Sequence, residues 1–187
     1  LPVPISLVPL LGGLAGMFFG ILFGYVTTKK SGTTFAMITL GIGELVSACA
    51  LMTPEFFGGE GGVSFNRVVG RPFYGISFGP QIQVYYLIAI WLFICALAIY
   101  AFTLTPLGRM TNAVRDNPER AEFVGYDTQR VRYLTLILSS FFAGIAGALA
   151  AINFEIANSA YLGAVQSGTV LFPTHIRIRR RMVVTGR

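Results

Sequence analysis

The sequence predicts an all-α protein, a polytopic bundle of membrane-spanning helices. Of its 187 residues, 54% are apolar and 12% are charged, and this charged share is about half that of an average soluble domain. Four segments are long enough for the roughly 20 apolar residues that a helix needs to cross a bilayer. Such an apolar chain is not intrinsically disordered, and two cysteines are too few for a disulfide scaffold.

The apolar segments define the expected domain organisation. A fifth stretch, residues 160–172, is too short to cross and is predicted to be a re-entrant or truncated span. We expect residues 1–172 to form the membrane domain and residues 173–187 to be a basic tail produced by truncation or frameshift, the alternative being a true juxtamembrane tail. Since the chain begins with Leu1, we expect an internal fragment of a longer protein. The four predicted spans are residues 5–26, 33–52, 84–104 and 131–152.

The basic residues of the loops predict the orientation of these spans. Lys29 and Lys30 make the first loop basic, whereas the second loop, residues 53–83, contains only Arg67 and Arg71. The positive-inside rule therefore places the first and third loops in the cytoplasm and the second loop outside. The third loop contains four arginines: Arg109, Arg115, Arg120 and Arg130.

Neither a catalytic site nor a metal site is expected. Cys49 and Cys95 lie in apolar runs and are interpreted as packing residues, and His175 is the only histidine. No residues form a nucleophile–base set or a pair of catalytic carboxylates. The net charge of +6 owes much to five arginines within residues 177–187, so it does not indicate nucleic-acid binding.

Small residues recur at helical spacing in the first and fourth spans. Glycines four residues apart form one face without side chains, which lets two helix backbones approach closely in lipid. We interpret them as helix-packing positions without a direct functional role. They are Gly12, Gly16, Gly20 and Gly24 in the first span and Gly144 and Gly147 in the fourth.

Two features are candidates for a substrate pathway. Glu44 lies within the second span, where a charged side chain normally faces protein or water. It either lines a pathway or pairs with a neighbouring helix, and the sequence leaves both open. Gly58, Gly59, Gly61 and Gly62 form the densest glycine cluster, interpreted as a re-entrant or outer loop bordering a cavity, with a plain flexible loop as the alternative.

The third loop contains a predicted short helix at residues 118–124. Asp116 or Asn117 can cap its start, Pro118 suits its first turn, and Gly125 suits its end. An isolated helix of two turns is marginal in water, so we expect it to lean on a partner or on the rest of the loop. Its mixed charges favour a protein interface, while a solvated connecting loop remains the alternative.

This loop resembles the cytoplasmic coupling loop of ABC-importer permeases, specifically the branched-chain amino acid permeases of the LivM type. The same order of motifs extends over about three quarters of the chain. The similar segments are residues 35–40, 58–62, 105–109, 113–117, 120–122, 125–126 and 142–149.

The resemblance implies a permease subunit of the bacterial inner membrane that moves leucine, isoleucine or valine. ATP would be hydrolysed by a separate ABC ATPase, so that this chain needs no cofactor, and the other partners would be a second permease subunit and a periplasmic solute-binding protein. The short helix would sit in a cleft of the ATPase. The residues implied in this coupling are Arg115, Asp116, Asn117, Pro118, Glu119, Arg120, Ala121, Glu122 and Gly125.

Two other classes of protein remain alternatives. A secondary transporter would need an ion or proton site within the spans, for which Glu44 is the only candidate. A membrane scaffold without transport activity would use the glycine faces for assembly only.

Overall fold

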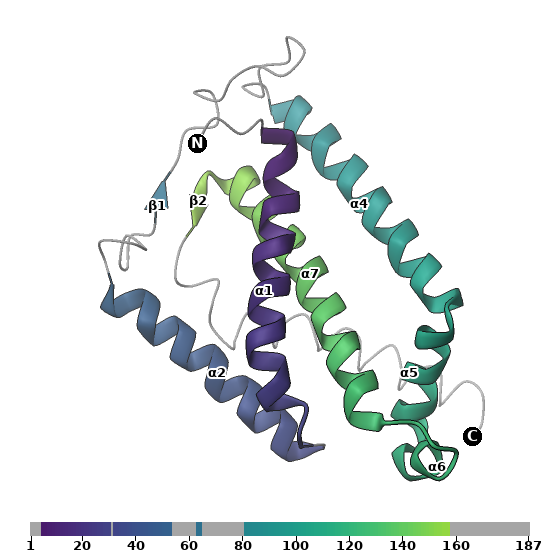
Figure 1. The fold of residues 1–187 in the computed structure, drawn as a ribbon. Coiled ribbons are helices and arrows are strands. Elements are labelled where there is room, and N and C mark those ends of the chain that lie inside the picture. The colour runs from purple at the N-terminus through teal and green to yellow at the C-terminus, as the bar shows by residue number, and fades with distance from the viewer. Residues whose placement is uncertain (1–4, 31, 54–62, 65–80, 158–187) are drawn as a thin grey trace, which may run out of the picture. The chain divides into compact units, whose positions relative to one another are not determined.

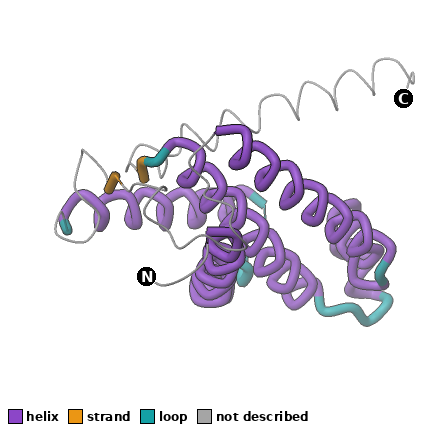
Figure 2. Tube along the Cα trace, turned by 90° about the horizontal axis from the view of Figure 1, so that it is seen from above, coloured by secondary structure: helices purple, strands orange, loops and turns teal. Residues whose placement is uncertain are grey.

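The structure, a computed structural model, describes residues 5–30, 32–53, 63–64 and 81–157. Helices make up nearly all of these residues (Figures 1 and 2). They form two compact units: α1, α4, α5, α6 and α7 belong to the first, and most of α2 with β1 and β2 belongs to the second. The elements are η1 (Ile5–Leu7), α1 (Val8–Thr27), α2 (Thr33–Met52), β1 (Val63–Ser64), α4 (Gln81–Leu104), α5 (Pro106–Asp116), α6 (Pro118–Phe123), α7 (Thr128–Phe154) and β2 (Ile156–Ala157).

The predicted helical membrane fold is confirmed. Four helices are long and apolar enough to span a bilayer: Ile5–Thr27, Thr33–Met52, Gln81–Leu104 and Thr128–Phe154. Each coincides with a predicted span to within about three residues at either end, which is the usual uncertainty of helix boundaries. The short stretch 160–172, the tail 173–187 and the glycine cluster 58–62 lie outside the described residues.

The first unit is organised around an antiparallel pair, α1 and α7. The order of the contacts shows the direction, because Gly12 lies against Gly144 and Ala148 whereas Gly24 lies against Tyr133 and Leu136. The pair is close along most of its length, and Figure 1 shows the two helices side by side. At one end the Tyr133 hydroxyl donates a hydrogen bond to the Ile21 carbonyl at 3.3 Å.

Missing side chains make this closeness possible. A Cβ atom built on Gly12 would lie 2.6 Å from the Ala148 Cβ, and one on Gly20 would lie 2.7 Å from the Ser140 Cβ. A Cβ on Gly16 would collide with the Ser140 carbonyl, and one on Gly144 with the Gly12 carbonyl. Because lipid gives no hydrophobic drive for helix association, such close backbone packing is a main source of contact energy.

Gly147 differs from the other glycines predicted to pack. A Cβ atom built there would meet no atom within 4 Å in the described part of the chain. Gly144 and Gly147 are both in α7, but only Gly144 faces α1. The prediction that Gly147 packs against a neighbouring helix therefore finds no support among the described residues.

Helix α4 joins the pair through a small apolar cluster. Leu87 of α4 packs with Ile145 and Leu149 of α7, and Trp91 and Phe142 lie at the edge of this cluster. The indole nitrogen of Trp91 also donates a hydrogen bond to the Ser6 carbonyl at 3.3 Å. The middle of α4 is thereby tied to η1, directly before α1.

The second unit contains most of α2 and one short strand pair. Val63 pairs with Ala157 and Ser64 with Ile156 in antiparallel register. The all-α prediction omitted this pair because two-residue strands leave no alternating pattern to detect. Glu44 lies in α2, and its side chain is on the surface of the described structure.

We predict that Gly144→Ala destabilises the first unit by about 1–3 kcal/mol, the usual cost of overpacking. The new methyl group would meet the Gly12 carbonyl and the Cα of Gly13. The matched control is Gly147→Ala in the same helix, which should leave stability unchanged or slightly raised. The thermal unfolding midpoint, followed by the fluorescence of the single tryptophan Trp91, measures both; equal midpoints would contradict the packing assignment.

Candidate functional site

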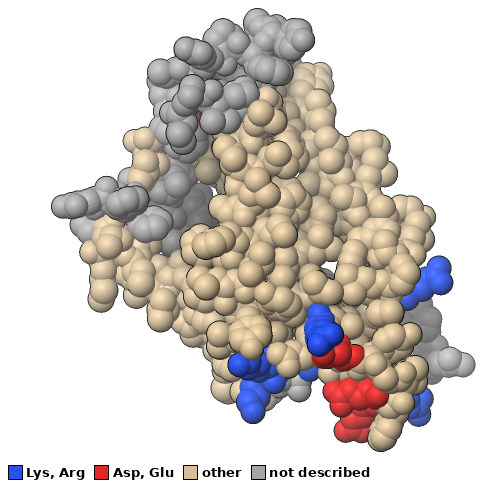
Figure 3. Space-filling view, viewed as in Figure 1, with Lys and Arg blue, Asp and Glu red and all other residues tan. Residues whose placement is uncertain are grey.

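Apart from Glu155 at the far end of α7, the charged residues in the described part of the first unit gather at one end. This end contains the connector, which we define as residues 105–127; it links α4 to α7 and includes α5 and α6. Figure 3 shows Lys, Arg, Asp and Glu side chains over this end and uncharged surface along the flank above it. Lys29 and Lys30 follow α1, whose last turns lie beside the first turns of α7. The first and third loops therefore share one end of the unit, as the orientation prediction requires.

The connector begins with a helix that the sequence analysis missed. The Thr105 hydroxyl caps α5 by accepting a hydrogen bond from the Gly108 amide at 3.3 Å, and Pro106 occupies the first helical position. A Cβ on Gly108 would collide with the Phe102 carbonyl, so the tight bend from α4 into α5 requires glycine here. The sequence does contain a signal for this helix that was not used. It is the Thr-Pro start followed by two apolar residues four positions apart, Met110 and Val114.

Helix α6 has the ends that the sequence predicted, to within one residue. The Asn117 side chain accepts a hydrogen bond from the Arg120 amide at 3.1 Å. At the other end Gly125 has a φ of +93°, which side-chain-bearing residues rarely adopt. The Gly125 amide bonds to the Glu122 carbonyl at 2.9 Å and the Tyr126 amide to the Ala121 carbonyl at 3.0 Å. This is a Schellman termination, so both ends are fixed by local chemistry.

The inner face of α6 leans on its neighbours. Ala121 is buried with Val114 of α5 and Val131 of α7, and Met110 packs against them. This small cluster supplies the support that an isolated six-residue helix lacks. The expectation that α6 needs other parts of the loop agrees with this packing.

A buried hydroxyl links α6 to α7. Thr128, the first residue of α7, is 4% exposed and donates a hydrogen bond of 2.7 Å to the Glu122 carboxylate. The same hydroxyl accepts a hydrogen bond from the Arg132 guanidinium at 3.3 Å. Sequence reasoning grouped Glu122 with the coupling residues and did not identify Thr128 or Arg132, because nothing in their spacing shows that the chain folds back at Gly125.

A second polar contact joins α5 to α7. The hydroxyls of Thr111 and Thr135 lie 3.0 Å apart. Each is also close to a carbonyl of its own helix, Leu107 for Thr111 and Val131 for Thr135. A hydroxyl can donate only one proton. The hydroxyl that donates to the threonine of the other helix therefore cannot also donate to the carbonyl of its own helix. The connector thus contacts α7 at two separate levels.

The outer face of α6 is exposed and partly apolar. Phe123 is 90% exposed and Val124 73%, although both follow directly after the buried inner turn. Glu119 and Arg120 are exposed beside them. Arg115 and Asp116, at the end of α5, form a surface ion pair at 3.4 Å, which contributes little stability. An exposed aromatic ring rimmed by opposite charges is typical of a protein contact surface.

Of the candidate pathway residues, Glu44 alone lies in the described part of the chain. Glu44 belongs to the second unit, and no hydrogen bond or ion pair links it to any residue in the described ranges. Gly58, Gly59, Gly61 and Gly62 are outside those ranges. Within the described ranges, no three His, Cys, Asp or Glu residues are grouped so as to hold a metal ion.

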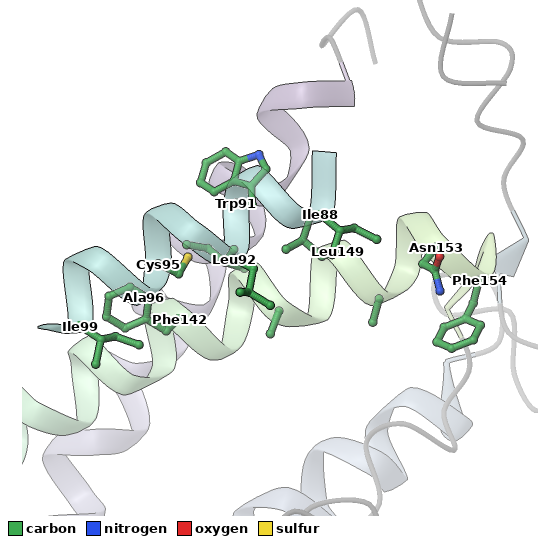
Figure 4. A pocket seen from close by; sticks show the side chains of 13 residues that line it. Ile88, Trp91, Leu92, Cys95, Ala96, Ile99, Phe142, Leu149, Asn153 and Phe154 are labelled. Atoms are coloured by element: carbon green, nitrogen blue, oxygen red, sulfur yellow. The ribbon is translucent and has the colours of Figure 1, made fainter. Parts of the chain in front are cut away.

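An apolar groove of about 580 Å³ runs between α4 and α7 in the first unit. Its lining includes Trp91, Cys95 and Ile99 from α4 and Phe142 and Leu149 from α7, with Asn153 near its end (Figure 4). The groove lies beside the apolar cluster of Leu87, Ile145 and Leu149, where α4 packs against α7. It was not predicted, since its two walls come from spans that are far apart in the sequence.

These features together define a polytopic helical membrane protein with a structured polar connector between two spans. The sequence pattern of the family described as "Branched-chain amino acid transport system / permease component" matches residues 2–173. The chain belongs to this family. The family and the four apolar helices place it in the bacterial inner membrane as a multi-pass protein.

Two relatives have the same name, "High-affinity branched-chain amino acid transport system permease protein LivM". One is from Escherichia coli (strain K12) and the other from Salmonella typhimurium (strain LT2). Each is 27% identical over 184 aligned positions, which cover 83% of this chain and 43% of the relative. The chain thus spans less than half the length of these relatives. No solved structure matches the chain significantly.

We predict that Asn117→Ala loosens α6 by about 1 kcal/mol, the typical cost of losing an N-terminal cap. The Arg120 amide would lose its side-chain acceptor. Asn117→Asp retains an acceptor oxygen and serves as the matched control. Amide hydrogen exchange of residues 118–124 measures the effect: it should speed up in the alanine variant only, and similar rates in both variants would count against the cap.

Proposed function

We propose that this chain acts as a permease subunit of an ABC importer for branched-chain amino acids, namely leucine, isoleucine and valine. The family membership and the names of the two relatives support this substrate class. A separate ATPase hydrolyses ATP, a second permease subunit completes the pathway, and a periplasmic binding protein delivers the solute. The chain has no catalytic site of its own in this proposal.

One observation carries the coupling part of the proposal: α6 is capped at both ends, supported from inside, and exposed outside. Ala121 holds the inner face against α5 and α7, while Phe123 and Val124 extend outward. A docking element must keep its shape when its partner moves, and local capping supplies that rigidity. We assign the docking of the ATPase to this outer face and place the connector in the cytoplasm.

Of the residues that the resemblance implies in coupling, the structure supports several different roles. Asn117, Pro118 and Gly125 shape the ends of α6, and Ala121 supports its inner face. Glu119 and Arg120 are exposed beside Phe123 and rim the proposed docking face. Arg115 and Asp116 lie one helix earlier, at the end of α5.

The direct test of the function is transport by the complete assembly. With the ATPase, the second permease subunit and the binding protein in proteoliposomes, we expect uptake of leucine, isoleucine or valine that requires ATP on the ATPase side. Uptake that persists without ATP and collapses with the proton gradient would contradict the proposal and favour a secondary transporter.

We predict that Phe123→Ala weakens binding of the ATPase about tenfold, as truncation of an aromatic anchor at an interface centre does. Phe123→Leu retains an apolar side chain and should retain most of the affinity. Co-purification of the ATPase from membranes measures both variants. Full retention in the alanine variant would exclude Phe123 as an anchor.

The location of α6 has its own test. In a variant of the whole protein with Glu119→Cys, a membrane-impermeant thiol reagent should react from the ATPase side only, because Glu119 is exposed on α6. Lys29→Cys provides the control for the same end of the unit. Labelling of Glu119→Cys from the periplasmic side would reject the docking assignment.

Glu44 has a separate prediction. If its carboxylate lines the pathway, Glu44→Gln should lower uptake several-fold while the amount of protein in the membrane stays the same, because the amide fits the same space but lacks the charge. Uptake and immunoblotting of the same membranes measure both quantities. Equal losses of both would indicate a packing role instead.

A further inference from the structure

The polar contact between α6 and α7 has a geometry that the docking role does not explain. Thr128 is nearly fully buried, and its hydroxyl donates to the Glu122 carboxylate at 2.7 Å and accepts from Arg132 at 3.3 Å. We call this arrangement the hydroxyl bridge. Its three residues come from α6 and from the first two turns of α7.

The charges around the bridge fix the direction of its hydrogen bonds. A hydroxyl has one proton to donate, and a carboxylate only accepts while a guanidinium only donates. Thr128 therefore lies between an acceptor of negative charge and a donor of positive charge, and both orient its proton toward Glu122. Hydrogen bonds to charged groups are the stronger class of hydrogen bond.

Few other contacts fix the position of α6 relative to α7. The apolar contact rests on the single methyl group of Ala121, and the chain between the two helices turns at Gly125. The Arg132 Nε is itself buried and has no hydrogen-bond partner in the described structure. The bridge is thus the main polar restraint on rotation of α6 about the Gly125 turn.

The bridge also begins a continuous mechanical connection. Thr128 and Arg132 belong to the first turns of α7, and the next residue, Tyr133, contacts Gly24 of α1 and bonds to the Ile21 carbonyl. The start of α7 is therefore joined to the backbone of α1 through the ring and hydroxyl of Tyr133. Such coupling requires a chain of packed groups of this kind.

We propose that Glu122 is a positioning residue that acts through Thr128, and that the hydroxyl bridge transmits displacements of α6 to α7. Glu122 is exposed at the surface, but its carboxylate is bonded to the buried Thr128 hydroxyl, and we assign it to the link with the membrane helices and not to ATPase binding. This inference rests on the proposed function. In this proposal Phe123 and its exposed neighbours on α6 bind the ATPase, and the contact of Glu122 with Thr128 transmits the displacement.

The test compares solute moved per ATP hydrolysed in proteoliposomes that contain the complete transporter. Thr128→Val removes the hydroxyl at nearly constant volume, and Thr128→Ser restores it. We expect the valine variant to bind the ATPase and hydrolyse ATP but to move about fivefold less solute per ATP, the factor for losing one hydrogen bond. The serine variant should stay within about twofold of the wild type.

A matched control uses a threonine outside the bridge. The Thr103 hydroxyl donates to the Tyr100 carbonyl of its own helix at 2.7 Å, so Thr103→Val should leave solute moved per ATP unchanged. A second approach removes the acceptor: Glu122→Ala should reproduce the loss, and the double variant Glu122→Ala/Thr128→Val should lose no more than either single variant. This pair also keeps the test decisive if one variant inserts poorly.

The outcomes separate the two proposals. Wild-type vesicles that show no ATP-dependent uptake would overturn the importer function and the bridge together. The bridge proposal alone would be overturned if both Thr128→Val and Glu122→Ala moved as much solute per ATP as the wild type. It would also be overturned if the double variant lost the sum of the two single losses. If Glu122→Ala lost ATPase binding while the solute moved per ATP stayed unchanged, Glu122 would be a contact residue of the docking face.

Discussion

The close backbone contact between α1 and α7 is the constraint on which the first unit depends. Gly12, Gly16, Gly20 and Gly144 leave no room for a side chain between the two helices. In lipid, a contact of this kind gains dispersion energy only while the surfaces fit closely. The pair therefore resists sliding and separation. It also fixes the positions of the elements attached to its ends.

The connector is built on one end of this pair. Helix α7 begins at Thr128, directly after the turn at Gly125, so its first turn serves both as a membrane helix start and as the support of α6. The inner contacts combine one small apolar cluster with polar links through Thr128 and Thr135. These contacts are small and partly polar, whereas the glycine contact behind them is a close fit of two helix backbones.

Helix α4 is held differently. It meets α7 at the Leu87 cluster and meets η1, directly before α1, through the Trp91 hydrogen bond, and beside that cluster an open apolar groove separates it from α7. Its far end passes through the Gly108 bend directly into α5. A displacement of the connector would accordingly act on the end of α4 and on the start of α7. Helix α4 would move more easily than α7, because fewer contacts hold it in place.

The sequence by itself determined the number and approximate ends of the described spans, since apolar length sets what can cross a bilayer. It also determined the ends of α6, because Asn117, Pro118 and Gly125 act on the backbone within a few residues. It did not reveal α5, whose buried face is completed by Ala121 and Val131. Only the tertiary structure decided that Gly144 meets α1 while Gly147 does not, and that the Glu122 carboxylate bonds to Thr128. The physical reason is the distance along the chain over which each effect acts. Helix caps and apolar lengths depend on residues close together in the sequence. The contact partner of a side chain or of a glycine face depends on how segments that are distant in the sequence pack against each other.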